Sequence, residues 1–221
     1  MASNKLAVII PTVNQFELLA KCLHSIESRD MVWQPFIIDN WNENIGVAAG
    51  WNKGIEAARK LGFDWFLVLN DDTQLSPFTI DMMRLELLKN PSAGMVSGNN
   101  IGQDPEQFKL AGGDPVQGCD FACFMLTEQS FHKIGYFDEN FSPAYFEDND
   151  YHYRSKLAGY NAVRVLSAPF IHLGSPTQYS EEGGLVSGDD FKKNRVYFMD
   201  KWGGMPGEET YTQPFDNNDL S

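Results

Sequence analysis

Basic side chains are scarce in this sequence, which contains 17 Lys and Arg against 30 Asp and Glu and carries a net charge of −13. Binding to nucleic acid requires a basic face toward the phosphates, and docking on anionic lipid requires a basic patch. The composition therefore argues against both kinds of partner. A phosphorylated ligand is still compatible with it, because a bound metal ion can supply positive charge locally.

Cysteine is rare as well, and Cys22, Cys119 and Cys123 cannot form an even disulfide framework. Free thiols in a reducing compartment are the simpler interpretation, and no paired Cys or His completes a tetrahedral zinc site. The sequence lacks any run of about 18 apolar residues, so we expect no membrane-spanning helix. The apolar run 6–10 is too short for the core of a signal peptide. These absences predict a soluble, cytoplasmic protein.

Two common nucleotide-binding fingerprints are also missing. Segment 42–54, NENIGVAAGWNKG, is rich in glycine and asparagine but matches neither GxGxxG nor the P-loop pattern. Glycine lets the backbone approach a ligand closely, and a helix N-terminus favours an anion. The alternative is a helix that tolerates glycine for packing reasons. Both interpretations of this segment stay open.

Apolar, β-branched runs and amphipathic helical patterns alternate over the first 100 residues. The predicted strands are 5–11, 35–39, 64–72 and 94–100, and the predicted helices are 14–28, 48–62 and 76–90. This alternation is typical of a parallel α/β sheet, which binds ligands in the crevice outside the carboxyl ends of its strands. Pro11, Asp39 and segment 70–72 would then lie at one edge of the sheet.

Capping and stop signals mark the ends of the predicted helices. Asn14 with Glu17 resembles a capping box, and Gly62 is expected to stop the second helix. Ser76 as N-cap with Pro77 at the first helical position predicts the start of the third.

The second half has a less regular pattern. The predicted strands are 119–127 and 161–167, and the predicted helices are 128–135, 147–159 and 189–202. We expect one domain, 1–203, with a smaller mixed α+β half at 101–203. Residues 204–221 contain no basic side chain and are expected to form a loose acidic tail.

Asp71 and Asp72 come shortly after the buried strand run FLVL, separated from it only by Asn70. Two adjacent carboxylates in that position repel each other and must be desolvated. Mg²⁺ or Mn²⁺ is commonly held by one or two carboxylates together with the oxygens of a bound diphosphate, so a divalent cation would offset the repulsion. The alternative is a helix-entry loop in which aspartate serves as a turn former.

Two single residues are further candidates. Asp39 could accept a hydrogen bond from a ring N–H, such as N3–H of uracil or thymine, although an ordinary turn residue explains the position equally well. His172 follows an apolar run and is either a structural histidine or a contact to a metal or phosphate.

A second acidic cluster comprises Glu147, Asp148 and Asp150. Acidic side chains in a first helical turn are favoured by the helix macrodipole, and this alone explains such a cluster. In the functional interpretation, one carboxylate is a general base whose pKa is raised by crowding and burial.

Seven short segments, taken in order, resemble the inverting glycosyltransferases of family 2, which have the GT-A fold. The segments are VIIPTVN, IIDN, NIGVAAGWNKGI, LVLNDD, GCDFACFMLT, YFEDNDYHYRSKLAGY and FIHLGS, and the match extends from residue 5 to about residue 175. NxGxAxGxNxGI, LNDD and the later KKNRVYFMDKWG look most like the rhamnosyltransferase-type branch. The resemblance implies a Rossmann-like, mostly parallel sheet flanked by helices. Residues 1–100 would bind the nucleotide and residues 101–203 the acceptor.

The resemblance also implies roles for individual residues. The nucleotide and donor sugar would be held by Pro11, Thr12, Asn14, Asp39, Asn44, Gly46, Asn52, Asn70, Asp71, Cys119 and Asp120. Asp72, Asp71 and His172 would hold a divalent metal, Mn²⁺ rather than Mg²⁺, although Asn70 stands where the family's DxD motif has its first Asp. Asp148 would be the catalytic base, with Glu147 beside it.

The implied activity is inverting transfer of a sugar from a nucleotide-diphosphate donor, UDP- or dTDP-linked, to a saccharide or other hydroxyl acceptor. A processive synthase is not expected, because no QxxRW-like segment occurs. Two rival functions remain. A sugar nucleotidyltransferase would carry a Gly-rich, basic loop after the first strand, which PTVNQFELL lacks. A non-catalytic module binding nucleotide sugar or carbohydrate is the other. The oligomeric state is open, with a homodimer as one option.

Overall fold

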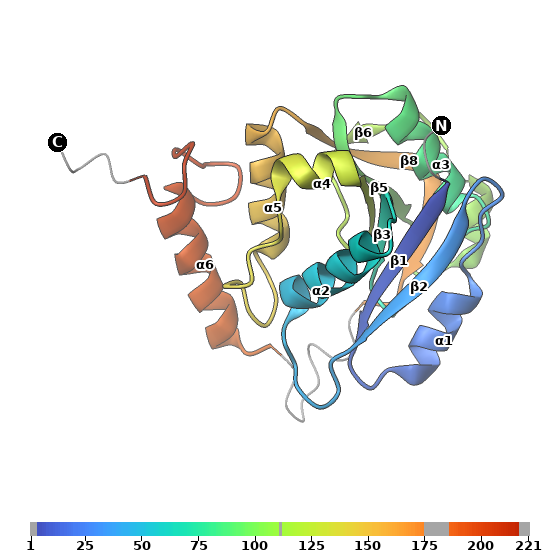
Figure 1. Ribbon diagram of the computed structural model, residues 1–221, viewed down its shortest axis with the longest axis horizontal. Coiled ribbons are helices and arrows are strands. Elements are labelled where there is room, and N and C mark those ends of the chain that lie inside the picture. The colour runs from blue at the N-terminus through green and yellow to red at the C-terminus, as the bar shows by residue number, and fades with distance from the viewer. Residues whose placement is uncertain (1–3, 111, 175–185, 217–221) are drawn as a thin grey trace.

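The computed structural model describes residues 4–110, 112–174 and 186–216, and its centre is one β-sheet with helices on both faces (Figure 1). The strands are β1 Lys5–Thr12, β2 Val32–Asp39, β3 Trp65–Leu69, β4 Thr73–Leu75, β5 Ala93–Asn100, β6 Val116–Gln117, β7 Cys123–Thr127 and β8 Asn161–His172. The helices are α1 Phe16–His24, α2 Val47–Lys60, α3 Thr79–Lys89, the 3-10 helix η1 Pro105–Leu110, α4 Glu128–Ile134, α5 Glu147–Leu157 and α6 Gly188–Trp202.

The strand order is β2-β1-β3-β7-β5-β8-β4, with β6 paired to β8. β1 is parallel to β2 and β3, and β5 is parallel to β8, whereas β7 runs antiparallel to both β3 and β5. β1, β2, β3, β5 and β8 therefore point the same way, which confirms the mostly parallel sheet flanked by helices. Strands from both halves of the sequence interleave in this one sheet.

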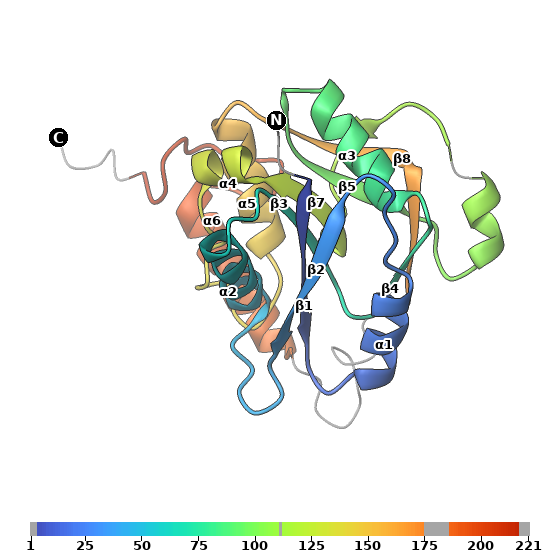
Figure 2. The same ribbon diagram turned by 45° about the vertical axis from the view of Figure 1, so that its right-hand side comes forward.

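Figure 2 shows α1 and α3 on one face of the sheet and α2, α4, α5 and α6 on the other. Successive side chains of β1 point to opposite faces of the sheet, as strand geometry requires. Leu6, Val8 and Ile10 pack in the cluster that includes Cys22 of α1. Ala7 and Ile9 pack in the cluster that contains residues of α2. The central strands are thus buried on both sides, which explains their continuous apolar runs.

Glycine in α2 has a packing role at one position. A Cβ added to Gly54 would lie 2.3 Å from Cγ2 of Ile9, so only glycine allows the helix to pack this close to β1. For this glycine, the packing interpretation of the 42–54 segment is correct. Gly62, in the left-handed region at φ 75°, follows the helix end as predicted.

Two predicted helix starts are wrong. Helix α1 begins at Phe16 after Gln15, with no side-chain cap, and Asn14 is an exposed residue at φ 52° rather than half of a capping box. Helix α3 begins at Thr79, two residues later than Pro77. Pro77 stands before the helix, in a turn in which the N–H of Thr79 donates to the carbonyl of Ser76 at 3.1 Å.

The described part of the acidic tail is packed rather than loose. The backbone N–H groups of Thr210 and Tyr211 both donate to the carbonyl of Trp202, at 3.0 Å each. The hydroxyl of Tyr153 donates to the carbonyl of Tyr211 at 2.8 Å. Residues 204–216 are therefore held against α5 and α6. Within the ranges that the structure describes, no helix has the length and apolarity needed to cross a bilayer.

Candidate functional site

Two adjoining pockets open at the edge where β1 and β3 end, and they share Val47, Trp51, Asn70 and Ala144 in their walls. The first has a cavity volume of about 100 Å³ and the second of about 230 Å³. The predicted site residues that line one or both are Pro11, Thr12, Asn44, Gly46, Asn70, Asp71, Asp72, Asp120, Glu147, Asp148 and His172. The fold thus brings most of the predicted residues to one edge, from segments separated by more than 100 positions.

The acidic pair after β3 has polar partners on both sides. Thr12 donates through Oγ1 to Oδ2 of Asp71 at 2.7 Å. Asp72 is 4% exposed, and its Oδ1 lies 3.2 Å from Nε2 of His172. The side-chain amide of Asn70 lies 3.4 Å from the same imidazole nitrogen. The acids and the distant histidine therefore form one polar cluster.

The short strand β4 explains why His172 reaches Asp72. Thr73, the residue after Asp72, is the register partner of His172 in the antiparallel pairing of β4 with β8. The N–H of Leu173 also donates to the carbonyl of Asp72 at 3.1 Å. The two segments are thus fixed by backbone contacts, which orient the side chains toward each other.

The electrostatics of this cluster follow from burial and close contact. Burial raises the pKa of Asp71 to about 6, and the charge of Asp72 adds to the rise while the Thr12 hydrogen bond opposes it. The hydrogen bond to Asp72 raises the pKa of His172. Both shifts reflect negative charge concentrated in a partly desolvated corner.

A divalent cation fits the donor atoms present at this corner. Carboxylate oxygens with one imidazole nitrogen are ligands that Mn²⁺ accepts. In the part of the chain that the structure describes, no group of three acidic, His or Cys side chains is arranged to hold an ion alone. The donor set therefore suits an ion that takes its remaining ligands from a bound diphosphate.

The second acidic pair opens helix α5. Glu147 is 6% exposed, and its Oε2 has no hydrogen-bond partner among the described residues. Burial, and secondarily the charge of Asp148, raises the pKa of Glu147 to about 8. Burial also raises the pKa of Asp148, although its Oδ1 accepts from the N–H of Asn149 at 2.8 Å. Two acids with raised pKa values in a pocket wall are typical of acid–base chemistry.

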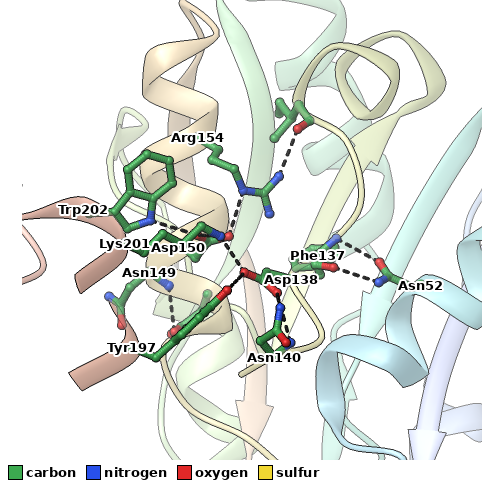
Figure 3. Close-up of polar contacts among 12 residues, drawn as sticks. Asn52, Phe137, Asp138, Asn140, Asn149, Asp150, Arg154, Tyr197, Lys201 and Trp202 are labelled. Atoms are coloured by element: carbon green, nitrogen blue, oxygen red, sulfur yellow. Dashed lines mark hydrogen bonds and ion pairs between the residues drawn. The ribbon is translucent and has the colours of Figure 1, made fainter. Parts of the chain in front are cut away.

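The third acid of this cluster, Asp150, has a structural role (Figure 3). It is fully buried, and its carboxylate lies 2.6 Å from Nζ of Lys201 and 2.8 Å from Nε of Arg154. The indole N–H of Trp202 donates to it at 2.9 Å. Lys201 also lies 2.6 Å from Asp138. These contacts tie α5 to α6 and to the preceding loop.

Four predicted donor-binding residues are absent from the walls of both pockets. Asp39 is exposed, and its Oδ1 accepts from the N–H of Trp41 at 2.9 Å. Asn52 is buried, and its amide group exchanges hydrogen bonds of 2.9 Å with the backbone of Phe137 (Figure 3). Asn14 is exposed, and Cys119 packs against the hydrophobic core on the α2 side of the sheet. Their donor-binding roles stay predictions.

Two backbone N–H groups at the start of α2 are bonded within the protein, although Gly46 and Val47 also line the first pocket. The N–H of Val47 donates to the carbonyl of Pro143 at 2.8 Å, and the N–H of Gly46 donates to Oδ1 of Asn44 at 3.1 Å. Gly46 has φ 86°, and a Cβ there would lie 3.1 Å from both Pro143 O and Ser142 Oγ. The glycine thus permits close approach of loop 142–143.

Several pocket residues carry no signal in the sequence. Asn40, 4% exposed, lines the first pocket beside Thr12, and its only hint is its place after a strand end. Trp51 lines both pockets, and its indole N–H has no partner within the described ranges. Ala144 and Tyr145 reach the pocket through a loop, which no spacing rule predicts.

Comparison with known proteins identifies similar proteins both by sequence and by structure. No family model matches the sequence. A galactofuranosyl glycosyltransferase of Leishmania donovani is 23% identical over 82% of this chain and 53% of its own. The solved structure of GalNAc-T7 with UDP, GalNAc and Mn²⁺ has a TM-score of 0.68 at 13% identity, covering 90% of this chain and 48% of that one. The structure of S. aureus TarS 1–349 has a TM-score of 0.58 at 12% identity, covering 78% and 61%.

The chain spans about half the length of the galactofuranosyl relative and of GalNAc-T7. The two structures have GT-A-like folds, which confirms the predicted fold class. The rhamnosyltransferase-type branch is not confirmed, because the curated relative is named for galactofuranosyl transfer. The chain has a GT-A-like fold, and its similarities support an enzyme of the transferase class.

Proposed function

We propose that this protein is an inverting glycosyltransferase that moves a sugar from a UDP- or dTDP-linked donor to a hydroxyl acceptor. One observation carries the proposal: the Asp71–Asp72–His172 cluster and the Glu147–Asp148 pair line adjoining pockets with a shared wall. Such a site could hold the diphosphate of the donor on one side of the transferred sugar and a general base on its other side. A GT-A-like fold agrees with that arrangement.

Asp148 is the proposed general base. Its carboxylate takes the proton of the acceptor hydroxyl while that oxygen forms a bond to the anomeric carbon. The bond from the anomeric carbon to the donor's phosphate oxygen breaks, and the nucleotide diphosphate leaves with the electron pair. Attack from the face opposite the leaving group inverts the anomeric centre in one step. No covalent intermediate with the protein is required.

The Asp72 carboxylate and the His172 imidazole, assisted by Asp71, would hold the divalent metal at the diphosphate. Bound there, the metal supplies Lewis-acid stabilisation of the negative charge on the leaving group. GalNAc-T7 was crystallised with UDP and Mn²⁺, which supports Mn²⁺ as the first ion to test. The Asn70 amide lies 3.4 Å from Nε2 of His172, and a metal bound at that nitrogen would replace this contact.

Asp39 is the proposed contact to the nucleobase. It is the register partner of Thr12, which lines the first pocket, so it lies at the same strand edge as the diphosphate corner. Its free carboxylate oxygen could accept from N3–H of uracil or thymine while the other oxygen keeps the turn to Trp41.

A nucleotide-release assay over a panel of donors tests the proposal. The panel contains UDP-galactofuranose, UDP-GalNAc, dTDP-rhamnose and a GDP-sugar, each with Mn²⁺, Mg²⁺ or EDTA. The first two follow the names of the similar proteins, and dTDP-rhamnose follows the resemblance to the rhamnosyltransferase-type branch. Slow hydrolysis of the correct donor can be detected without an acceptor.

The outcomes separate the candidate functions. Metal-dependent release of a nucleoside diphosphate from one donor, with an inverted sugar product, supports the transferase. Metal-dependent binding of UDP without turnover supports the non-catalytic module instead. Formation of a nucleotide sugar from a nucleoside triphosphate and a sugar phosphate would identify a nucleotidyltransferase. Silence in all three assays contradicts the proposal.

A further inference from the structure

The turn that leads into α5 has an unusual backbone. Tyr145 and Phe146 have φ angles of 78° and 73°, so two successive non-glycine residues lie in the left-handed region. That region is disfavoured for bulky side chains, because Cβ approaches the following carbonyl oxygen too closely. Phe146 is the N-cap of α5 and makes no side-chain capping bond. Contacts from elsewhere must therefore hold this turn.

The consequence for the pocket is direct. Tyr145 lines the second pocket, and the next helical residues, Glu147 and Asp148, line the same wall. The two left-handed residues set the direction in which the chain enters α5. The conformation of residues 144–146 thereby determines where the proposed base stands relative to the bound sugar.

Asn194 of α6 supplies the polar contact to this turn. Its side-chain N–H₂ group donates to the carbonyl of Ala144 at 2.9 Å and to the carbonyl of Tyr145 at 3.2 Å, across about 50 residues of sequence. Asn194 is completely buried. Its orientation is fixed by chemistry, since two carbonyl oxygens can be met only by the nitrogen end of the amide. Among described residues, the amide oxygen has no hydrogen-bond partner.

The same face of α6 makes two further contacts, one to the turn and one to α5. Phe198, one helical turn after Asn194, packs against Phe146 with ring centroids 5.8 Å apart. Lys201, a further turn along, lies 2.6 Å from Asp150 of α5. The spacing 194, 198 and 201 places these contacts on one stripe of the helix. Phe198 and Lys201 attach α6 to the turn and to α5, but Asn194 alone of the three bonds the backbone of residues 144 and 145.

We propose that Asn194 is a positioning residue, whose amide keeps the Ala144–Phe146 turn in its left-handed form and so sets the location of Asp148 in the pocket. Its catalytic consequence rests on the proposed transferase function. The placement of a base to within about 1 Å can change a rate by about 100-fold. Loss of the Asn194 amide is therefore expected to slow the chemical step more than it weakens nucleotide binding.

The test compares wild type with Asn194→Leu, which keeps the branched shape and the number of heavy side-chain atoms and removes both N–H donors. Asn194→Ala is the second variant, in case leucine impairs folding. Arg59→Ala is the matched control, because Arg59 also makes two close hydrogen bonds, of 2.8 and 2.7 Å to Glu128, and lines neither pocket. Three quantities are measured: amide hydrogen exchange of residues 144–150, affinity for UDP with Mn²⁺, and kcat across pH.

We expect faster exchange confined to residues 144–150 in the Asn194 variants, a fall in kcat of about 10- to 100-fold, and UDP affinity within about threefold of wild type. The rise of kcat with pH, set by the base, should shift or flatten. The proposal is overturned if the variants exchange and turn over like Arg59→Ala, or if UDP affinity falls in parallel with kcat. If wild type turns over no donor, the transferase proposal fails. The hydrogen-exchange comparison then still supports or overturns the role of Asn194 in holding the turn.

Discussion

The two acidic pairs of the site are held in different ways, although both line a pocket. Asp71 accepts a hydrogen bond from Thr12, and Asp72 lies 3.2 Å from His172. Glu147, in contrast, has a buried oxygen without a partner among the described residues, and its pKa is raised to about 8. The first pair is stabilised by direct polar partners. Both pairs are largely desolvated, since burial also raises the pKa of Asp71, but the position of the second pair depends on the backbone that leads into it.

This difference suggests different chemistry at the two ends. A carboxylate that is to bind a cation must stay charged, and polar neighbours favour the charged form. A carboxyl group that is to accept a proton works best when its pKa lies near the working pH, and burial raises it in that direction. The two pairs would therefore respond differently to neutral substitutions. Four such substitutions, taken from the largest expected effect to the smallest, test the comparison.

Asp148→Asn removes the proposed base without changing its size. General-base catalysis contributes about 10²- to 10⁴-fold, so kcat should fall by about 1,000-fold. Affinity for UDP with Mn²⁺ should stay close to the wild-type value, because the amide occupies the same volume. Turnover and calorimetric titration on the same preparations measure both. Asp189→Asn on the exposed end of α6 is the matched control, and near-wild-type turnover in Asp148→Asn would assign the base elsewhere.

Asp72→Asn tests the metal corner. Several kcal/mol of leaving-group stabilisation are attributed to a bound metal, so turnover should fall by about 100-fold. Unlike the change at Asp148, this one should also weaken UDP binding in Mn²⁺. Removal of metal with EDTA should reduce UDP affinity in wild type and have little further effect in the variant. Equal EDTA sensitivity in both proteins would show that Asp72 is no metal ligand.

Some features of the two acidic pairs could be predicted from the sequence and others could not. Strand ends could be predicted, because buried runs such as that before Asp71 stop abruptly at polar residues and parallel strands bring their ends together. The contact of His172 with Asp72 was expected only from the family resemblance. No local pattern indicates it, since it depends on the three-residue strand β4.

The second half shows the limit of local signals more clearly. The residues themselves predict the acid-rich first turn of α5, but they do not show which of its acids line the pocket and which has a structural role. The structural role of Asp150 is visible only from its contacts with Lys201, Arg154 and Trp202 (Figure 3). Likewise, no periodicity indicates that Asn194 contacts Ala144 and Tyr145. These long-range polar contacts leave no local pattern in the sequence.

Glu147→Gln should change stability more than turnover. The folded-state pKa of Glu147, about 8, lies above its ordinary value of 4.5, so the folded protein binds the extra proton between these values. The free energy of unfolding of wild type should therefore fall as pH rises from about 4.5 to about 8. The glutamine variant should lose less over that range, and it should be the more stable protein at pH 8. Urea unfolding at pH 5, 6, 7 and 8 measures both curves, and parallel curves would contradict the buried-acid interpretation.

Asp39→Asn is expected to have the smallest effect and to resolve the role of an exposed acid. Asparagine preserves the turn in which Asp39 accepts from the N–H of Trp41, because both side chains form such turns. Only the charge and one acceptor oxygen change, so a pure turn residue would show no effect. If the carboxylate accepts N3–H of the base, the KM for a UDP- or dTDP-linked donor should rise by about tenfold, as expected for one hydrogen bond to a charged group, with kcat unchanged. An unaltered KM would leave base recognition to the pocket wall around Asn40 and Thr12.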